Sequence, residues 1–370
     1  MNRKNIKLFS FFSGSGLLDL GFEAAGFQVE FVNEICPSFM DAYKYTRKKL
    51  KTHLPKYGYF NNNINDFFQK IQDRNKLENY MEDARKDRSL TGFIGGPPCP
   101  DFSAAGKNKG RDGINGKLSS SYTQLISVMK PDFFLFENVK GLWRTAKHRE
   151  YYKELKEILH IQGYIMTERL VNAMEYGVPQ DRDRVLLFGV HENTLKRIGN
   201  KNISSFVWDR YQIYHLDEIK NIEWPGMEEF HTDIMTPCPQ AVLEDLTVEH
   251  WFRKNDVINH PNGSDYFVPR TGLAKMQMIQ EGDVSRKSYK RLHRWRYSPT
   301  AAYGNNEVHL HPYKARRLSV AEAMAVQSLP KEFELPPDMT LTDKFKTIGN
   351  GVPFLLANGI AKTIDDFLRE

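Results

Sequence analysis

Apolar runs alternate with amphipathic stretches over the first half of the chain. Those with the length and composition of strands are residues 6–12, 28–33, 92–95, 133–137 and 184–190. Helical spacing is found in residues 17–27, 39–45 and 151–162. The basic run TRKKLK at 46–51 is predicted to be the solvated end of a helix. Strands that alternate with helices predict an α/β fold with a doubly wound sheet of parallel strands.

This alternation stops near residue 192, where scattered Pro, Gly, Trp and Tyr and an irregular charge pattern begin. A chain of 370 residues is also long for one domain. We therefore predict a first domain at 1–192 and a second, smaller domain at 193–340. An apolar helix over 353–368 is too short to form a domain, so residues 341–370 are expected to complete the first domain.

Composition narrows the class of protein without identifying its partner. Apolar residues make up 40% of the chain, which supports a packed core. The net charge of +6 permits a nucleic-acid partner but does not demonstrate one. The 3 cysteines form no CxxC pair and no HExxH is present, so no metal site is predicted and a reducing compartment is favoured. No signal peptide and no membrane span are expected.

A glycine turn, SGSG at 13–16, separates the first predicted strand from the first predicted helix. Such a turn lets the backbone approach a nucleotide at a helix N-terminus. Glu34 ends the next strand, where its carboxylate can bind both hydroxyls of a ribose. Because the third glycine of GxGxxG is absent, a nicotinamide cofactor, S-adenosylmethionine and a turn without a ligand all remain open. Asp66 is predicted to end the following strand and reach an adenine amino group, with a helix cap as the alternative.

Cys99 lies in FIGGPPCP, directly after an apolar strand and a Gly-Gly turn. This places it at the carboxyl edge of the sheet, where open α/β folds bind ligands, and the flanking prolines stiffen the backbone around its thiol. We predict a catalytic cysteine, although lone cysteines are more often small core residues. Cys238 also lies between two prolines, but no strand precedes it, so the alternative of a small core residue is favoured for it. Cys36 is expected to be structural.

Two further segments deliver charged side chains to the same edge. Glu137 follows a run of phenylalanines, so its carboxyl group should be poorly solvated and able to hold a proton near neutrality. Arg182 and Arg184 are two residues apart on a strand and should point to one face, where they suit a base edge or a phosphate. A surface network with Asp181 and Asp183 is the alternative.

In chain order, these motifs resemble those of the DNA (cytosine-5) methyltransferase family, in the form found in bacterial restriction–modification systems. The matching segments are FSGSG, NE at 33–34, ND at 65–66, GGPPCPDFS, FENV, PQDRDR, RRLSVAEAMAVQSLP at 316–330 and TIGNGVP at 347–353. The resemblance does not extend to residues 191–290, where the family places its target-recognition segment. Pro100 stands where many members have Gln, and SLP replaces the commoner GFP.

The resemblance implies an S-adenosylmethionine-dependent methyltransferase fold, with a Rossmann-like sheet and a target-recognition domain at 193–340. It also implies S-adenosyl-L-methionine as the cofactor and double-stranded DNA as the substrate. A cytosine would be flipped out of the duplex, and Cys99 would add to its C6 while Glu137 shares a proton with N3. Arg182 and Arg184 would hold the O2 side of the base and the neighbouring backbone while the activated C5 takes the methyl group, with Arg184 the more direct candidate by motif match.

The family's cofactor motifs match Phe12, Ser13, Gly14, Ser15, Gly16, Leu17, Leu18, Glu34, Ile35, Asp66, Phe67, Pro98, Leu118, Asn350, Gly351 and Val352. The glycine-rich stretch at 103–121 has the composition of a mobile lid. It is expected to contact DNA through Ser103, Lys107, Lys109, Arg111 and Lys117. A basic strip at 284–297 should add Arg286, Lys287, Lys290, Arg291 and Arg294. The alternatives are a surface loop without a role and a solvated basic face over a core Trp295.

Rival functions share part of this pattern. They are a cytosine-5 methyltransferase acting on transfer RNA, a catalytically silent DNA-binding regulator on the same scaffold, and a NAD-dependent oxidoreductase. The long segment after PQDRDR favours DNA over RNA, and the combination of Cys99, Glu137 and Arg184 favours an enzyme over a silent binder. We expect a monomer in the cytoplasm, associated with the nucleoid, with any cognate restriction endonuclease acting separately.

Overall fold

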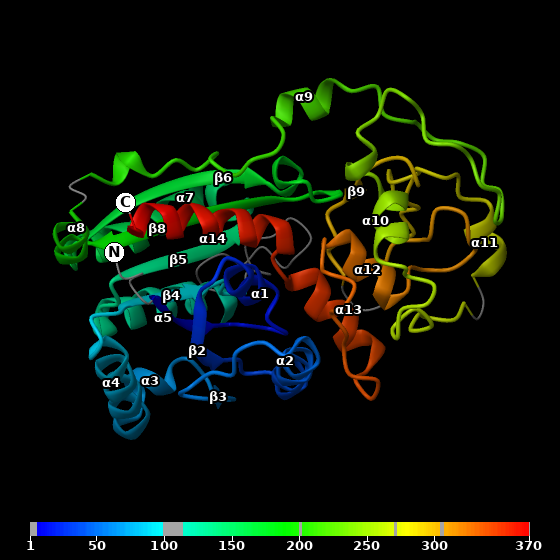
Figure 1. Cartoon of the computed structure of the whole chain (residues 1–370). Helices are drawn as coiled ribbons and strands as arrows, with labels where there is room; N and C mark the ends of the chain where they lie inside the picture. The colour runs from blue at the N-terminus through cyan, green and yellow to red at the C-terminus, as the bar shows by residue number, and fades with distance from the viewer. Residues whose placement is uncertain (1–5, 99–113, 200–201, 270–271, 304–306, 370) are drawn as a thin grey trace.

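The computed structural model describes residues 6–98, 114–199, 202–269, 272–303 and 307–369. Its main sheet has seven strands in the order β3-β2-β1-β4-β5-β8-β6 (Figure 1). These strands are β1 (Ile6–Phe11), β2 (Gln28–Asn33), β3 (Tyr59–Phe60), β4 (Leu90–Gly95), β5 (Phe133–Val139), β6 (Tyr164–Asn172) and β8 (Asp183–His191). Helices cover both faces, so the predicted doubly wound α/β fold is confirmed.

The strand β8 departs from the prediction of a parallel sheet. It runs antiparallel to both of its neighbours, β5 and β6, whereas the strand pairs of this sheet that do not include β8 are parallel. The segment between β6 and β8 holds η2 (Ala173–Tyr176) and the two-residue strand β7 (Gln180–Asp181). This segment is too short for the helical crossover that parallel strands require, so the chain must turn back on itself.

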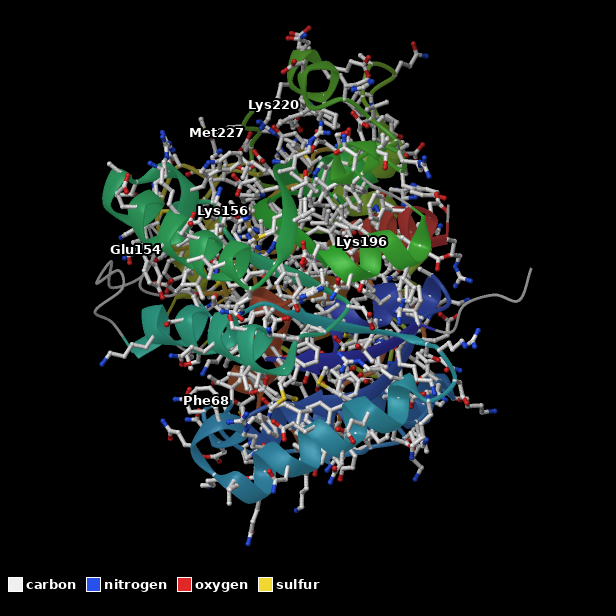
Figure 2. All side chains as sticks on the ribbon, turned by 90° about the vertical axis from the view of Figure 1, so that its left-hand side faces the viewer. Phe68, Glu154, Lys156, Lys196, Lys220 and Met227 are labelled. Atoms are coloured by element: carbon white, nitrogen blue, oxygen red, sulfur yellow. The ribbon has the colours of Figure 1, made fainter. Side chains whose placement is uncertain are left out.

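Two hydrophobic layers hold the helices on the sheet, and side chains fill the space on both sides (Figure 2). One face carries α1 (Leu17–Ala24), α2 (Pro37–Leu50) and α14 (Phe354–Arg369). The other carries α3 (Asp66–Gln69), α4 (Ile71–Arg85), α5 (Ile114–Met129) and α7 (Ala146–Ile161). The helices α14 and α1 approach closely because Gly21 lacks a side chain: a Cβ there would lie 2.4 Å from that of Ala357.

The region after β8 is built from short elements joined by irregular chain (Figure 1). They are α8 (Glu192–Ile198), η3 (Ile203–Ser205), α9 (Leu216–Asn221), η4 (Glu244–Leu246), α10 (Val248–Lys254), α11 (Leu273–Gln277), β9 (Ser298–Pro299), α12 (Val320–Val326) and α13 (Leu341–Asn350). Residues of α10, α12 and α13 share a hydrophobic core with Leu17, Leu20 and Phe39 of α1 and α2. The two regions are therefore fixed to each other through the helices beside the glycine turn.

The carboxyl ends of β1, β4 and β5 lie side by side. Phe11 pairs with Gly95, and Gly95 pairs with Phe136 on its other side. The strand order also reverses between β1 and β4, which is where open α/β sheets bind ligands. Three sequence motifs therefore leave the sheet at one place.

No helix in the described part of the chain combines the length and apolar character that a membrane crossing needs.

Candidate active site

The turn after β1 has an unusual backbone. Gly14 and Gly16 have φ angles of 57° and 84°, in the left-handed region that glycine adopts without strain. Phe12 also lies there, with φ of 54°, which is strained for a residue with a side chain and is often found at ligand sites. Gly16 is the N-cap of α1, and the side chains of Leu17 and Leu18 that follow pack into the core.

Glu34 lies beside this turn. Its carboxylate accepts a hydrogen bond from the Gly14 N–H at 2.8 Å through one oxygen and from the Cys36 N–H at 2.8 Å through the other. Burial raises the pKa of Glu34 above its usual range, while these N–H donors act in the opposite direction. Ile35 is 60% exposed directly after it. The acid and the turn predicted to bind one cofactor are therefore in contact.

Two residues that were not among the predicted site residues, Thr347 and Arg47, also hold the turn. The Ser15 N–H donates to Thr347 Oγ1 at 3.2 Å, and that hydroxyl donates to Ser15 Oγ at 2.9 Å. Arg47 Nη2 donates to the Gly16 carbonyl at 2.8 Å. Arg47 belongs to the TRKKLK run predicted to be solvated, yet it is fully buried, so that prediction is wrong for this residue.

Ser13 provides a test of whether this turn fits a polar cofactor. Its side chain is buried, and its Oγ has no hydrogen-bond partner within the part of the chain that the structure describes. A buried hydroxyl without a partner is costly, and a polar ligand in the turn would satisfy it. Together with the adjacent carboxylate of Glu34, this fits the nucleoside and amino-acid groups of S-adenosylmethionine.

Asp66 and Phe67 lie at the start of α3. The prediction that Asp66 ends a strand is wrong, because β3 ends at Phe60 and Asp66 is the first residue of a helix. Its carboxylate forms an ion pair with Lys70 at 3.1 Å. The ring of Phe67 is buried among Phe11, Phe31 and Phe60, so its side chain belongs to the core.

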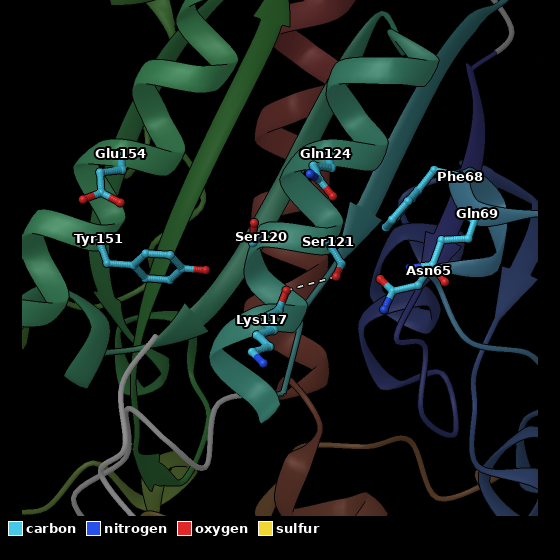
Figure 3. A pocket seen from close by; sticks show the side chains of 9 residues that line it. All are labelled: Asn65, Phe68, Gln69, Lys117, Ser120, Ser121, Gln124, Tyr151 and Glu154. Atoms are coloured by element: carbon cyan, nitrogen blue, oxygen red, sulfur yellow. Dashed lines mark hydrogen bonds between the residues drawn. The ribbon is translucent and has the colours of Figure 1, made fainter. Parts of the chain in front are cut away.

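A cavity of about 450 Å³ opens between α3, α5 and α7 (Figure 3). Its lining is mainly polar and consists of Asn65, Phe68, Gln69, Lys117, Ser120, Ser121, Gln124, Tyr151 and Glu154. These residues adjoin Asp66, Phe67 and Leu118 in the sequence and include Lys117, which was predicted to meet DNA. The cavity therefore lies beside Asp66, the residue predicted to reach an adenine amino group.

The predicted lid is helical in its last part. Lys117 to Ser121 lie in α5, where Ser121 Oγ donates to the Lys117 carbonyl at 3.0 Å, so the prediction of a mobile lid is wrong for this portion (Figure 3). Leu118 packs on the core from this helix. Pro98, which precedes this stretch in the sequence, is exposed. Ser103, Lys107, Lys109 and Arg111 lie outside the described residues.

Glu137 at the end of β5 forms an ion pair with Arg184 on the neighbouring strand β8. Glu137 Oε1 and Arg184 Nε are 2.6 Å apart, and both side chains are about nine-tenths buried, with exposures of 10% and 9%. The burial of Glu137 matches the expectation, but its pairing with Arg184 was not foreseen. Gly96 makes room for this carboxylate, because a Cβ there would lie 2.4 Å from Glu137 Oε2.

The acids of the PQDRDR segment do not pair with its arginines. Asp181 pairs with Lys220 at 2.7 Å and Asp183 pairs with Lys140 at 2.6 Å. Asn172 Nδ2 donates to both aspartates, at 2.7 and 2.9 Å. The alternative interpretation, a network of Arg182 and Arg184 with these aspartates, does not describe this segment.

Arg182 differs from Arg184 in its partners. It is 1% exposed and donates to the main-chain carbonyls of Ala301 at 3.0 Å, Gly349 at 2.7 Å and Gly351 at 3.0 Å. The prediction that both guanidinium groups would hold the base therefore needs correction for Arg182. Its hydrogen bonds fix the segment after α13 beside the sheet.

Asn350, Gly351 and Val352 form that segment. Asn350 is exposed at the end of α13, and Val352 is buried in the core. Gly351 lies against Leu17, since a Cβ at Gly351 would be 2.3 Å from Leu17 Cδ2. The predicted cofactor residues at the two ends of the chain are thus neighbours in space.

The three cysteines have different settings. Cys99 lies outside the described residues, directly after Pro98. Cys36 is the N-cap of α2 and its N–H bonds Glu34, consistent with a structural residue. Cys238 is half-buried, and burial raises the pKa of its thiol, which disfavours a thiolate.

The basic strip at 284–297 is divided by burial. Arg286 and Lys287 are exposed and Lys290 is half-buried. Arg291 is fully buried, and Arg294 is paired with Glu281 at 2.7 Å and 3% exposed. The expectation of phosphate contacts is therefore wrong for Arg291 and Arg294, because their guanidinium groups are enclosed and already bonded.

Comparisons with protein families, curated proteins and solved structures show what nearly the whole chain is similar to. A sequence model of the C-5 cytosine-specific DNA methylases matches residues 6–366. The chain is 55% identical to the Type II methyltransferase M.NmeDI of Neisseria meningitidis serogroup C, over 99% of this chain and 85% of that protein. It is 29% identical to the Type II methyltransferase M.FnuDI of Fusobacterium nucleatum, over 99% and 96%. The solved structure of the S. pombe Dnmt2 methyltransferase has the same fold, with a TM-score of 0.58 at 13% identity, covering 99% of this chain and 98% of that one.

Proposed function

This chain belongs to the C-5 cytosine-specific DNA methylases, and we propose that the edge formed by β1, β4, β5 and β8 is its active site. The enzyme transfers a methyl group from S-adenosylmethionine to C5 of cytosine within a specific DNA sequence. The observation that carries the proposed location is the buried pair of Glu137 and Arg184, 2.6 Å apart, at the edge where the GGPPCP segment leaves the sheet.

The glycine turn would hold the cofactor. Glu34 would receive the ribose hydroxyls, and Ser13 Oγ would gain its missing partner. Asp66 would face the adenine. S-adenosylmethionine, when bound, supplies a methyl group made electrophilic by its sulfonium.

Cys99 would be the nucleophile. Its thiolate adds to C6 of the cytosine, which breaks the conjugation of the ring and gives C5 the electron density of an enamine. After C5 has gained the methyl group, loss of the C5 proton restores the double bond and expels the thiolate. The cytosine must first leave the base stack, at a cost of a few kcal/mol.

Glu137 and Arg184 would hold the pyrimidine while this happens. Glu137 shares a proton with N3 and so limits the negative charge that addition at C6 places on the ring. Arg184 faces the O2 side. Arg182 acts differently: by holding the carbonyls of Gly349 and Gly351, it positions the segment that closes the cofactor site.

The remaining assignments concern DNA and the cell. Residues 1–192 with 341–370 form the catalytic domain, and 193–340 form the target-recognition domain. Of the basic strip, Arg286, Lys287 and Lys290 would meet phosphates, as would Ser103, Lys107, Lys109 and Arg111 near Cys99. The enzyme would act as a monomer in the cytoplasm, at the nucleoid, with any cognate endonuclease separate, as suits relatives of restriction–modification type.

Methyl transfer from labelled S-adenosylmethionine to mixed-sequence duplex DNA and to transfer RNA tests this proposal. Wild type should label C5 of cytosine in DNA, and Glu137→Gln should lower kcat by about a hundredfold or more. Glu150→Gln, an exposed acid on α7, is the matched control and should keep full activity. Label found in transfer RNA alone, or full activity in Glu137→Gln, would contradict the proposal.

A further inference from the structure

The glycine turn is held at three successive residues by side chains from three different parts of the chain. Glu34, after β2, binds the Gly14 N–H, and Thr347 of α13 binds the Ser15 N–H. Arg47 of α2 binds the carbonyl of Gly16. All three side chains are buried, and Arg47 is buried completely.

Arg47 is itself fixed from several directions. Its Nε is 2.9 Å from Glu23 Oε2, and its guanidinium lies 4.3 Å from the centre of the Tyr43 ring. The Tyr43 hydroxyl donates to Asp19 at 2.9 Å, and Asp19 also accepts from the Ser10 hydroxyl at 2.8 Å. Asp19 and Glu23 both belong to α1, so one buried network connects α2 to the helix that begins at the glycine turn.

The space around Gly16 is too small for a side chain. A Cβ at this position would lie 2.6 Å from the Tyr43 ring and 2.7 Å from Arg47 Nη2. The φ of 84° at Gly16 also excludes a side chain without strain. The Arg47 guanidinium is paired with Glu23, packs on the Tyr43 ring and donates to the Gly16 carbonyl. It therefore fixes the position of the peptide after Gly16 and of the N–H groups that follow.

We propose that Arg47 is a positioning residue for the methyl donor: it holds the floor of the glycine turn in the conformation that accepts S-adenosylmethionine. This inference rests on the proposed placement of the donor in that turn. Arg47 does not touch the donor, because its guanidinium is enclosed beneath the turn. Its loss should therefore weaken donor binding and leave DNA binding, which involves other surfaces, nearly unchanged.

Isothermal calorimetry of S-adenosylmethionine with DNA-free enzyme tests this directly. Arg47→Met should raise the donor Kd by about tenfold or more, as expected for the loss of a hydrogen bond made by a charged group. Arg47→Lys, which keeps the charge but carries its donors on a single nitrogen, should lie between. Lys48→Met, an exposed charge on the same helix, is the matched control and should stay within about twofold of wild type.

A merely structural role is separated by a second readout. Affinity for a mixed-sequence duplex, measured by fluorescence anisotropy, should change by less than about twofold in Arg47→Met. An unchanged donor Kd, or equal losses for donor and DNA, would overturn the inference. If Arg47→Met does not fold, the double variant Arg47→Met/Glu23→Gln, which removes both charges, and Arg47→Lys decide by the same criterion. Failure of the wild type to bind the donor would instead refute the proposed site.

Discussion

The sheet region and the region after β8 satisfy their backbone polar groups in different ways. In the sheet, ladders between strands pair N–H and C=O groups over long registers, such as the nine residue pairs of β6 with β8. After β8, the helices and strands are short, so side chains form hydrogen bonds with backbone groups that strand ladders would otherwise pair. Arg291 alone donates to the carbonyls of Ile279 at 2.9 Å, Met276 at 2.6 Å and Lys314 at 3.0 Å, and also to that of His311.

This difference changes what a basic residue means. In irregular chain, a buried carbonyl without a ladder partner needs a donor, and arginine offers five N–H groups in a fixed geometry. Basic sequence in such a region is therefore evidence of internal scaffolding as much as of DNA binding. Arg182, Arg291 and Arg294 all serve this purpose in the present fold.

The largest effect should come from Arg291→Met, which removes this scaffold. Buried carbonyls lose their donor, and we expect roughly 3 kcal/mol or more of destabilisation. Urea unfolding measures this free energy, and hydrogen exchange should place the loss in residues 276–314. Arg286→Met, at an exposed position of the same strip, is the control and should cost less than about 0.5 kcal/mol. Equal costs for the two variants would remove the contrast between buried and exposed basic residues.

A second test concerns the contact between the ends of the chain. Gly351→Ala should place a methyl group against Leu17 and destabilise the fold by about 1–3 kcal/mol, with weaker donor binding. Leu17→Ala makes space at a cost of its own, so the double variant should be destabilised by less than the sum of the two single variants. A double-mutant cycle of unfolding free energies measures this coupling. Additive costs would show that the two residues do not constrain each other.

Acid should separate the two regions. Burial lowers the pKa of His309 to about 3 and also lowers the pKa values of His293 and His311, all of them after β8. A depressed folded-state pKa contributes stability that is present above the unfolded value of about 6.5 and is lost as the pH falls. For His309 this loss is about 2 kcal/mol at pH 5.

Hydrogen exchange at pH 7 and pH 5, corrected for intrinsic rates, measures that effect. Protection should fall more in residues 290–311 than in β1 and β4. His309→Phe should reduce the pH dependence, whereas His160→Gln, at an exposed position on α7, should leave it unchanged. A uniform change over both regions would argue that these histidines are not linked to regional stability.

The smallest effect should come from the exposed half of the basic strip. Lys287→Gln should weaken binding to duplex DNA by a few fold and lower the slope of log K against log salt by about 1. The free energy of unfolding should not change. Anisotropy titrations over a salt series provide the slope. An unchanged slope would place the DNA path away from this strip.

The parts that could be predicted were those with strong local signals. Apolar runs marked β1, β2, β4 and β5 to within a few residues, and helical spacing marked α2, α7 and α14. Fold class followed from their alternation. The antiparallel β8 could not, because strand direction depends on the length of a connection whose own structure was not evident.

The positions of Glu34 and Glu137 beside the ends of β2 and β5 were predicted from the apolar runs before them. Their roles in binding cofactor and substrate stay predictions. Arg47 and Thr347 were missed because their roles depend on contacts between segments far apart in sequence. Asp66 was placed on a strand because the brief β3 left no clear apolar run. Charge alone did not separate Arg291 from Arg286, since burial is decided by the tertiary fold.

The central claim is that this enzyme activates cytosine through Cys99. The most direct test uses a pool of random duplexes containing 5-fluorocytosine, with S-adenosylmethionine, because fluorine at C5 cannot leave as a proton does. Wild type and Cys238→Ser should accumulate a covalent adduct that depends on the methyl donor, and Cys99→Ser should form none. An adduct that persists in Cys99→Ser, or none in wild-type protein that binds the donor, would contradict this account.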